Sequence, residues 1–304
     1  MKERVVLIGG SGFVGSNISK RLTFSGHPVV IPTRDRNQIT KIENKHVLVK
    51  AVYLSDFTAT SLNEFFKTLT PDDVVINLIG ILHSSKGTPY GPEFAHAHVE
   101  IPQMIMAAMK QYGLKRYIHM SALGADVNGP SMYLRSKGVA EEFVKSSDLD
   151  WTIFRPSVIF GRDDNFINMF GKLQKYFPVM PLAGAKNLFQ PVSVQDVSEA
   201  FTAAISMTGT IHQSYDLAGP EVFTLVQIIQ FAAKREGLKR PIIPLPAWMG
   251  YLQALVLENV PGPKIMSRDN LDSMKVPSVL APNQANALAD VFGITPKSLE
   301  SLMQ

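Results

Sequence analysis

The sequence predicts an α/β fold in which a doubly wound parallel sheet is joined to a smaller, mostly helical C-terminal lobe. Two observations predict this class. Short apolar runs alternate with helical patterns through the first half of the 304-residue chain, as in consecutive βαβ units. From about residue 222 onward the chain becomes helical and is punctuated by prolines, which is typical of a separate lobe.

The elements of the alternating half can be placed one after another. Strands are expected at residues 4–9, 28–32, 46–51, 73–80, 115–120 and 150–155. Helices are expected between them, near residues 12–25, 58–69, 91–112 and 131–147. After Pro156 the rhythm changes, and a further strand and helix are expected within residues 190–205, followed by one more strand at 214–221.

Residues 4–22 place a strand, a glycine-rich turn and a helix in succession. Gly9 and Gly12 leave no Cβ where a pyrophosphate must approach, and the following helix directs its free N–H groups at the charge. Gly15 would let that helix pack closely on the sheet. Glycines also cluster in ordinary strand–turn–helix connections, but here they separate an apolar run from a helical pattern. The stretch therefore predicts a Rossmann-type dinucleotide site.

This site divides the chain into two expected parts. Residues 1–160, with residues 188–218 returning to them, are expected to form the dinucleotide-binding Rossmann domain. Residues 161–187 and 219–304 are expected to form the smaller lobe, which would contact a substrate or a partner.

Composition excludes several classes of protein. Hydrophobic residues make up 45% of the chain, enough for a large core, so disorder is excluded. The chain has no cysteine, which excludes disulfides, thiolate metal sites and a cysteine nucleophile. The net charge of +4 comes from scattered residues and gives no support for nucleic-acid binding. We find no signal-peptide pattern and no apolar run long enough to span a membrane, so we expect a cytoplasmic protein.

The end of the second strand predicts which dinucleotide is bound. In an NAD site an acidic side chain usually ends this strand and binds the adenosine ribose. Here Thr33 and Arg34 end it, and a guanidinium suits a phosphate, to which Arg36 could add a second charge. NADP(H) is therefore favoured over NAD(H). The alternative is a solvated loop of alternating charge, with Asp35 as the residue that would reverse the preference.

Tyr133 and Lys137 are four residues apart on a predicted helix, so they share one face. A lysine ammonium near a phenol favours the phenolate and lowers the tyrosine pKa, which improves proton transfer near neutrality. The helix follows the strand at 115–120, whose C-terminal end should face the cofactor cleft. The pair is the candidate reaction centre, and the alternative is an exposed pair without chemistry.

Other polar residues allow simpler interpretations. His96 and His98 are two apart on a predicted helix and point in different directions, so no metal site is expected. Asp196 follows a strand and begins a helix, which favours a capping role. Asn77 ends a strand in the cleft, where contact with a ribose and stabilisation of the turn are equally consistent with its position.

The stretch from Leu245 to Leu257 is rich in apolar and aromatic side chains. Its apolar width on a helix favours core packing or the lining of a substrate pocket. The alternative is a surface for a protein partner or a membrane, since aromatic-rich amphipathic helices can lie at an interface. That alternative would suit a quinone-linked or respiratory-complex role, peripheral to the inner membrane.

Several motifs together resemble the extended short-chain dehydrogenase/reductases. These are the stretch Ile8–Gly15, Tyr133 with Lys137, "FRPSVIFG" at 154–161 and "PVSVQDV" at 191–197. The match spans most of residues 4–225. Three shorter motifs resemble, more narrowly, the atypical branch that contains the nucleotide-binding accessory subunit of respiratory complex I and its bacterial relatives. They are "NLIG" at 77–80, "IHMSALGAD" at 118–126 and "YLRSK" at 133–137.

The resemblance implies roles for individual residues. Tyr133 would donate the proton, Lys137 would hold the nicotinamide ribose, and Pro156 with its neighbours would flank the nicotinamide ring. Two positions depart from the family. The active hydroxyl normally stands about two residues beyond Ser121, where this chain has Leu123, and the asparagine expected on the helix at 91–112 is His98.

The expected site residues follow from the motifs and the resemblance. The expected catalytic residues are Tyr133, Lys137 and Ser121. The expected cofactor contacts are Gly9, Ser11, Gly12, Phe13, Val14, Gly15, Thr33, Arg34, Arg36, Asn77, Leu78, Ile79, Gly80, Ser121, Tyr133, Lys137, Pro156 and Val158.

Three functions fit these features. The first is an NADPH-dependent oxidoreductase that acts on a small carbonyl or quinone-like substrate, with Tyr133 handling the proton. The second is a structural or assembly subunit that binds the cofactor without chemistry, which Leu123, His98 and the apolar C-terminal lobe support. The third is a redox sensor that reports the NADP(H) ratio to a partner.

Overall fold

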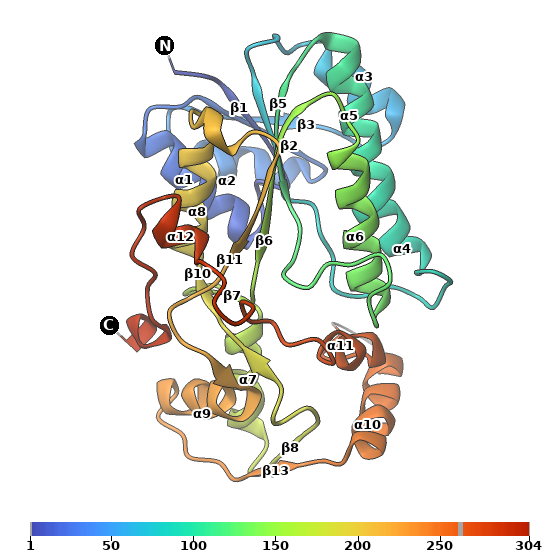
Figure 1. Ribbon diagram of the computed structural model, residues 1–304, viewed down its shortest axis with the longest axis vertical. Helices are drawn as coiled ribbons and strands as arrows, with labels where there is room; N and C mark the ends of the chain where they lie inside the picture. The colour runs from blue at the N-terminus through green and yellow to red at the C-terminus, as the bar shows by residue number, and fades with distance from the viewer. Residues whose placement is uncertain (1, 261–263, 304) are drawn as a thin grey trace.

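The computed structural model describes residues 2–260 and 264–303 and has the predicted α/β fold. Seven parallel strands form the central sheet, in the order β11-β6-β5-β4-β1-β2-β3 (Figure 1). They are β1 (Val5–Ile8), β2 (Val29–Thr33), β3 (Val49–Tyr53), β4 (Val74–Asn77), β5 (Arg116–Met120), β6 (Asp150–Pro156) and β11 (Gln213–Leu217). The order reverses between β1 and β4, which opens a crevice at the carboxyl ends of these two strands. The doubly wound parallel sheet is therefore confirmed.

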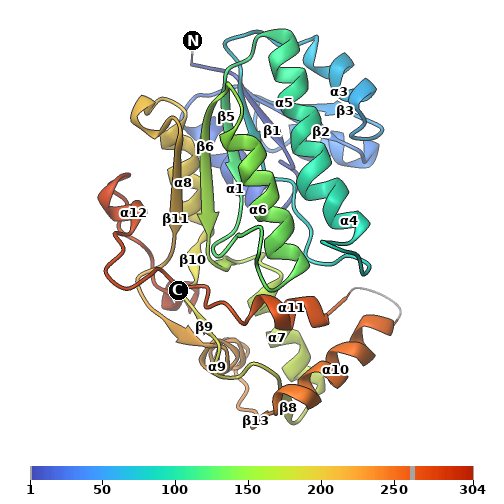
Figure 2. The same ribbon diagram turned by 45° about the vertical axis from the view of Figure 1, so that its right-hand side comes forward.

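Helices cover both faces of the sheet, so its strands are buried on both sides (Figures 1 and 2). One face is covered by α1 (Phe13–Phe24), α2 (Ile39–Glu43), α8 (Val194–Ala204) and α12 (Ala287–Asp290), and the other by α3 (Ala59–Phe66), α5 (Ile101–Tyr112) and α6 (Met132–Lys145). Side chains alternate along each strand. Val5 and Leu7 of β1 therefore pack toward α1 and α8, whereas Val6 and Ile8 pack toward α3 and α5. This double burial explains why the strands read as continuous apolar runs in the sequence.

The helix predicted at 91–112 is divided into three segments. They are α4 (Pro92–Phe94), a π-helical stretch (Ala95–Glu100) and α5. Pro102 has no N–H to donate to the carbonyl four residues earlier, so the regular hydrogen-bond ladder is interrupted there. The wide turn carries His98 on its buried side.

A small lobe lies below the sheet in Figure 1 and has its own apolar core. It contains α7 (Phe166–Tyr176), α9 (Leu225–Arg235), α10 (Ala247–Asn259) and α11 (Arg268–Ser273). Short strands pair around it: β7 (Ile159–Phe160) with β10 (Val192–Ser193), β8 (Met180–Leu182) with β13 (Ile242–Pro244), and β9 (Leu188–Phe189) with β12 (Phe223–Thr224). Short 3₁₀ segments occur at Arg36–Gln38, Thr208–Thr210 and Leu299–Met303. The helix α7 and most of these short strands are additions to the sequence prediction.

Helix α10 corrects the favoured interpretation of the stretch from Leu245 to Leu257. Core packing or the lining of a substrate pocket was expected, and core packing is wrong, because only Gly250 and Ala254 of this helix are buried. Trp248 is 69% exposed and Val256 58% exposed. The helix is apolar on nearly every side, so its sequence pattern gave no indication of which face would be covered.

The segment from α12 to Lys297 returns to the Rossmann domain, whereas Leu299 and Leu302 pack in the core of the small lobe. The carboxylate of Asp196 in α8 accepts a hydrogen bond from the backbone N–H of Lys297, at 2.7 Å. The cap of α8 is instead Ser193, whose Oγ accepts from the N–H of Gln195 at 3.2 Å. The capping role predicted for Asp196 is therefore wrong, because its carboxylate binds a distant segment. Within the described residues, no helix has both the length and the apolar character needed to cross a membrane.

Candidate dinucleotide site

The glycine-rich turn joins β1 to α1 at the point where the sheet order reverses. Gly9 has a φ of +84°, and a Cβ there would lie 3.1 Å from the carbonyl carbon of Leu78. Gly12 begins α1 without any side-chain cap. A Cβ on Gly15 would lie 2.4 Å from the carbonyl oxygen of Gly9, so this glycine lets α1 pack against the turn itself rather than against the sheet. The sequence prediction missed Gly10, where a Cβ would lie 2.8 Å from the carbonyl oxygen of Leu7.

The segment after β4 lies beside this turn because β1 and β4 are hydrogen-bonded neighbours. Asn77 is fully buried, and its Nδ2 donates to the hydroxyl of Tyr117 at 3.1 Å. Its Oδ1 accepts from the N–H of Ile79 at 3.1 Å, which ends the strand at Asn77 rather than at residue 80. The amide therefore stabilises the turn, which is one of the two roles predicted for it.

At the end of β2, Arg34 is exposed and the neighbouring carboxylate of Asp35 is hydrogen-bonded within its own turn. Asp35 Oδ1 accepts from the N–H of Asn37 at 2.9 Å and begins the 3₁₀ segment. Thr33 is buried, whereas Arg34 is exposed and its guanidinium carbon lies 5.7 Å from the ring centre of Phe57. Asp35, the residue that could have reversed the NADP(H) preference, thus accepts a hydrogen bond within its own turn.

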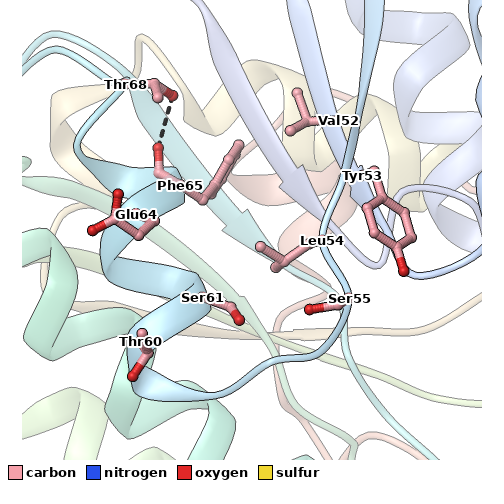
Figure 3. A pocket seen from close by; sticks show the side chains of 9 residues that line it. All are labelled: Val52, Tyr53, Leu54, Ser55, Thr60, Ser61, Glu64, Phe65 and Thr68. Carbon is pink, nitrogen blue, oxygen red and sulfur yellow. Dashed lines mark hydrogen bonds between the residues drawn. The ribbon is translucent and has the colours of Figure 1, made fainter.

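The second arginine of this loop stacks on the sheet edge. The guanidinium carbon of Arg36 lies 4.0 Å from the ring centre of Tyr53, at the end of β3. Figure 3 shows a shallow hollow that Tyr53 shares with α3. Its lining residues are Val52, Tyr53, Leu54, Ser55, Thr60, Ser61, Glu64, Phe65 and Thr68. None of these residues was predicted as part of the site, but Tyr53 packs on Arg36 and the N–H of Leu54 donates to the carbonyl oxygen of Thr33 at 2.9 Å.

Tyr133 and Lys137 lie on the buried side of α6, so the interpretation of an exposed pair is wrong. The side chain of Lys137 is 2% exposed, and its Nζ donates to the backbone carbonyl of Met120 at 3.2 Å. The ring of Tyr133 packs edge-on against Phe94 and His98, with ring centres 6.0 Å and 5.5 Å away. A Cβ on Gly80 would lie 3.4 Å from the Lys137 Nζ, so this glycine keeps the space above the ammonium open.

The electrostatics of the pair differ from the prediction. Burial raises the pKa of Tyr133 to about 12, and burial lowers the pKa of Lys137 to about 8. The expected lowering of the tyrosine pKa by the lysine is therefore wrong for this structure. The physical reason is the direction of the ammonium, which donates to the backbone carbonyls of Met120 and Ile79.

His98, the residue that the resemblance places at the family's asparagine, joins α6 to the segment after β4. Its Nε2 accepts from the N–H of Ile81 at 3.0 Å. In the neutral ring the proton then lies on Nδ1, which donates to Ser136 Oγ at 2.8 Å. Ser136 in turn donates to the carbonyl oxygen of Tyr133 at 2.8 Å. Burial lowers the pKa of His98 to about 2, so the ring is neutral, whereas His96 is exposed and contacts Glu100.

The ends of β5 and β6 bring the remaining predicted residues together. Ser121 is 4% exposed, and its N–H donates to the carbonyl oxygen of Phe154. Among the described residues, its Oγ has no hydrogen-bond partner. The N–H of Leu123 donates to the carbonyl oxygen of Pro156 at 3.0 Å, which joins the segment after β5 to the end of β6.

The prediction missed a buried ion pair behind Lys137. Glu141 is 2% exposed and accepts from Arg155 Nε at 2.7 Å and from Lys145 Nζ at 2.9 Å. Although burial raises the pKa of Glu141, the hydrogen bonds and charge of Arg155 outweigh it, so the pKa lies below its ordinary value. The signal was present in the sequence, because Glu141 follows Lys137 by four residues on the same helix face.

These features define a class of protein. The reversal of strand order, the glycine turn at the reversal and the pair of a half-buried Tyr133 and a buried Lys137 are those of a Rossmann-type dinucleotide-binding protein of the short-chain dehydrogenase/reductase kind. Over residues 9–175 the chain matches the family described as NAD(P)H-binding, and it belongs to that family.

Comparison with curated proteins supports this family and indicates which of its members the chain resembles. The chain is 30% identical over 303 residues to the mitochondrial NADH dehydrogenase [ubiquinone] 1 alpha subcomplex subunit 9 of Mus musculus, covering 97% of this chain and 77% of that protein. It is 23% identical over 252 residues to the photosystem II assembly factor Ycf39 of Guillardia theta, covering 80% of this chain and 73% of that protein. The resemblance to the complex I accessory subunit is therefore confirmed.

Solved structures show the same fold at lower sequence identity. A nucleoside-diphosphate-sugar epimerase from Staphylococcus aureus superposes with a TM-score of 0.74 at 16% identity, covering 99% of each chain. A UDP-glucose 4-epimerase from Thermus thermophilus, solved in complex with NAD, superposes with a TM-score of 0.65 at 19% identity, covering 90% of this chain and 99% of that one.

Proposed function

We propose that the protein binds NADP(H) and serves as a cofactor-binding subunit or assembly factor rather than as an oxidoreductase. The observation that carries the cofactor preference is the end of β2. The carboxylate of Asp35 is held by its own turn, while Arg34 is exposed. A guanidinium at this position suits the adenosine 2′-phosphate, which NAD(H) lacks.

The proposed binding mode assigns the remaining residues to the two halves of the dinucleotide. The pyrophosphate would lie against the turn from Gly9 to Gly12, where the N-terminus of α1 has no side-chain cap. Lys137 and Tyr133 would face the nicotinamide ribose across the space that Gly80 leaves open. The nicotinamide half would be completed by Leu78, Ile79, Ser121, Pro156 and Val158. The half with the adenine and the pyrophosphate would be completed by Ser11, Phe13, Val14, Thr33 and Arg36.

Two observations favour binding over turnover. Burial raises the pKa of Tyr133 to about 12, so its proton is held tightly at neutral pH. Leu123 supplies no hydroxyl where the family polarises a carbonyl, and loss of one such donor typically costs ~10²-fold or more in rate. Cofactor binding without chemistry still stabilises a fold, by an amount that grows with ligand concentration over Kd.

The alternative is an oxidoreductase acting on a small carbonyl or quinone-like substrate. The position of Tyr133 beside the open space above Lys137 favours it. Carbonyl-dependent oxidation of NADPH that disappears in Tyr133→Phe, with NADPH affinity retained, would decide for this alternative.

The cofactor assignment is tested by Arg34→Asp. We expect the variant to lose about 10- to 100-fold in affinity for NADPH, because a charge-assisted bidentate contact becomes a repulsion. Its affinity for NADH should stay the same or rise. Thermal unfolding with each nucleotide in turn measures both, and Lys41→Asp, an exposed charge reversal nearby, is the matched control. Equal or tighter binding of NADH by the unmodified protein would refute the assignment.

The apolar face of α10 is the proposed docking surface of the smaller lobe, which we assign to residues 161–187 and 219–304 without the stretch from α12 to Lys297 that packs on the Rossmann domain. Trp248, Leu252 and Val256 are more than half exposed, recur every four residues and line a shallow groove with Pro181 and Leu245. Residues 247–259 contain no lysine or arginine, which an interfacial helix uses to attract anionic lipid. We therefore propose a protein partner with an apolar surface, at the cytoplasmic side of the inner membrane.

Leu252→Glu tests the docking surface. In cells of the source organism, we expect the unmodified protein to migrate on native gels within a high-mass assembly that contains respiratory-complex subunits. The variant should migrate at its own mass, because a carboxylate cannot be buried unpaired, and its NADPH affinity should be unchanged. Phe24→Glu, an 88% exposed site on α1, is the control. Flotation of the unmodified protein with phosphatidylglycerol vesicles, together with unaltered migration of Leu252→Glu, would instead indicate a lipid surface.

A further inference from the structure

We propose that Asp269, on α11 of the small lobe, is a positioning residue for the nicotinamide half of the dinucleotide site. The proposal rests on the proposed function, because it concerns how the same site is held. Figure 2 shows α11 directly beneath the first turn of α6, the helix that carries Tyr133 and Lys137.

The carboxylate of Asp269 closes the N-terminus of α6. Its Oδ1 accepts from the N–H of Met132 at 2.7 Å, and its Oδ2 accepts from the N–H of Tyr133 at 3.1 Å. The next N–H, that of Leu134, is satisfied by Ser131 Oγ at 3.1 Å. The first N–H groups of a helix have no partner within the helix, and a negative charge there is favoured by the helix dipole. Asp269 is 9% exposed, so water competes little for these bonds.

The same short helix also binds the segment after β4. Asn270 Nδ2 donates to the carbonyl oxygen of Leu82 at 3.3 Å. Ser273 Oγ lies 2.8 Å from Ser131 Oγ, the cap residue of α6. Helix α11 thus contacts both walls of the space in front of Lys137: the first turn of α6 and the segment that includes Gly80.

The adenine half of the site is built from other segments. The glycine turn follows β1 and Arg34 follows β2, and the bonds of α11 described above reach neither. A change in α11 should therefore shift the position of Tyr133 and Lys137 while the pyrophosphate turn keeps its shape. The two halves of the ligand can then be tested separately.

Asp269→Asn is the test variant, and Asp272→Asn is its matched control. Asp272 lies on the same helix but binds Tyr251 and Lys275 rather than α6. Calorimetric titration with NADPH should show about a 10-fold loss of affinity in Asp269→Asn, the effect expected when a charged helix cap is lost. Titration with adenosine 2′,5′-bisphosphate, which occupies only the adenine half, should show less than about a 2-fold change. Equal weakening of both ligands, or unchanged NADPH affinity, would overturn the proposal.

Amide hydrogen exchange tests the contact between the Asp269 carboxylate and the N-terminus of α6 without any ligand. We expect faster exchange at Met132 and Tyr133 in Asp269→Asn than in Asp272→Asn, because the amide offers one uncharged oxygen where the carboxylate offered two charged ones to these N–H groups. If Asp269→Asn does not fold, Ser273→Ala should weaken NADPH binding in the same direction by a smaller factor. A protein that binds neither nucleotide would refute the proposed function, and unchanged exchange at these two amides would refute the role of Asp269.

Discussion

Replacement of Gly15 by alanine is expected to destabilise the folded protein, whereas replacement of Gly12 by alanine is expected to weaken cofactor binding alone. A Cβ on Gly15 would lie 2.4 Å from the carbonyl oxygen of Gly9 and 2.5 Å from the Cα of Gly10. Both are backbone atoms of the tight turn, so the clash is not relieved by a rotation of side chains. We expect a loss of at least the ~1–3 kcal/mol typical of overpacked cores.

Gly12 is the matched comparison in the same turn. A Cβ there would lie 3.5 Å from the carbonyl oxygen of Gly9, an ordinary contact, and its φ of −74° is accessible to alanine. Stability should therefore change by less than ~0.5 kcal/mol. The added methyl would occupy the approach to the N-terminus of α1, so NADPH affinity should fall at least ~10-fold. Urea unfolding and NADPH titration measure the two effects, and an unchanged affinity in Gly12→Ala would place the pyrophosphate elsewhere.

Glu141→Gln is expected to lower the free energy of unfolding by about 3 kcal/mol at neutral pH, because removing one partner leaves a buried charge uncompensated. The charge left behind is that of Arg155, whose side chain is 26% exposed and keeps the carboxylate of Asp216 at 3.8 Å, so we expect the lower end of the range measured for buried pairs. The matched control is Glu142→Gln, the next residue of α6, which is exposed. Urea unfolding of the three proteins measures the difference.

The pH dependence of this difference has a defined sign. The pKa of Glu141 is lower in the folded protein than its ordinary value of 4.5, so the folded state holds the carboxylate more strongly than the unfolded chain does. Its contribution is fully present above the unfolded pKa and is lost as the pH falls through the folded pKa. The stability of Glu141→Gln should therefore approach that of the unmodified protein below pH 4.5. A difference that stays constant as the pH falls from neutrality to well below that value would contradict the ion pair as its cause.

The parallel sheet and the glycine turn could be predicted because their signals are local. Each buried strand is a short apolar run bounded by polar or turn-forming residues, as Val5–Ile8 is by Arg4 and Gly9. The position of Tyr133 and Lys137 after the fifth strand was predicted for the same reason. The strand at 73–80 was predicted too long because Asn77 ends it with a side-chain hydrogen bond that apolar patterning does not report.

The parts that could not be predicted depend on contacts between distant segments. Asp269 lies 136 residues from Tyr133, and nothing in its neighbourhood marks it as a helix cap for α6. The pKa of Tyr133 depends on burial under Phe94 and His98, which helix periodicity alone does not give. The exposure of Trp248 was likewise unpredictable, because a helix that is apolar on all sides has no preferred buried face.

The position of α12 has a consequence for how the chain folds during synthesis. Ala287 and Leu288 of this helix pack beside β11, in the core cluster that also contains Val5 and Leu7 of β1. The part of this cluster beside β11 therefore stays uncovered until residues 287 and 288 have emerged. Contacts of such long sequence separation form late and slowly, and exposed strand surface is prone to aggregate in the meantime. Nascent chains arrested short of residue 287 are thus the form of this protein that most needs a chaperone.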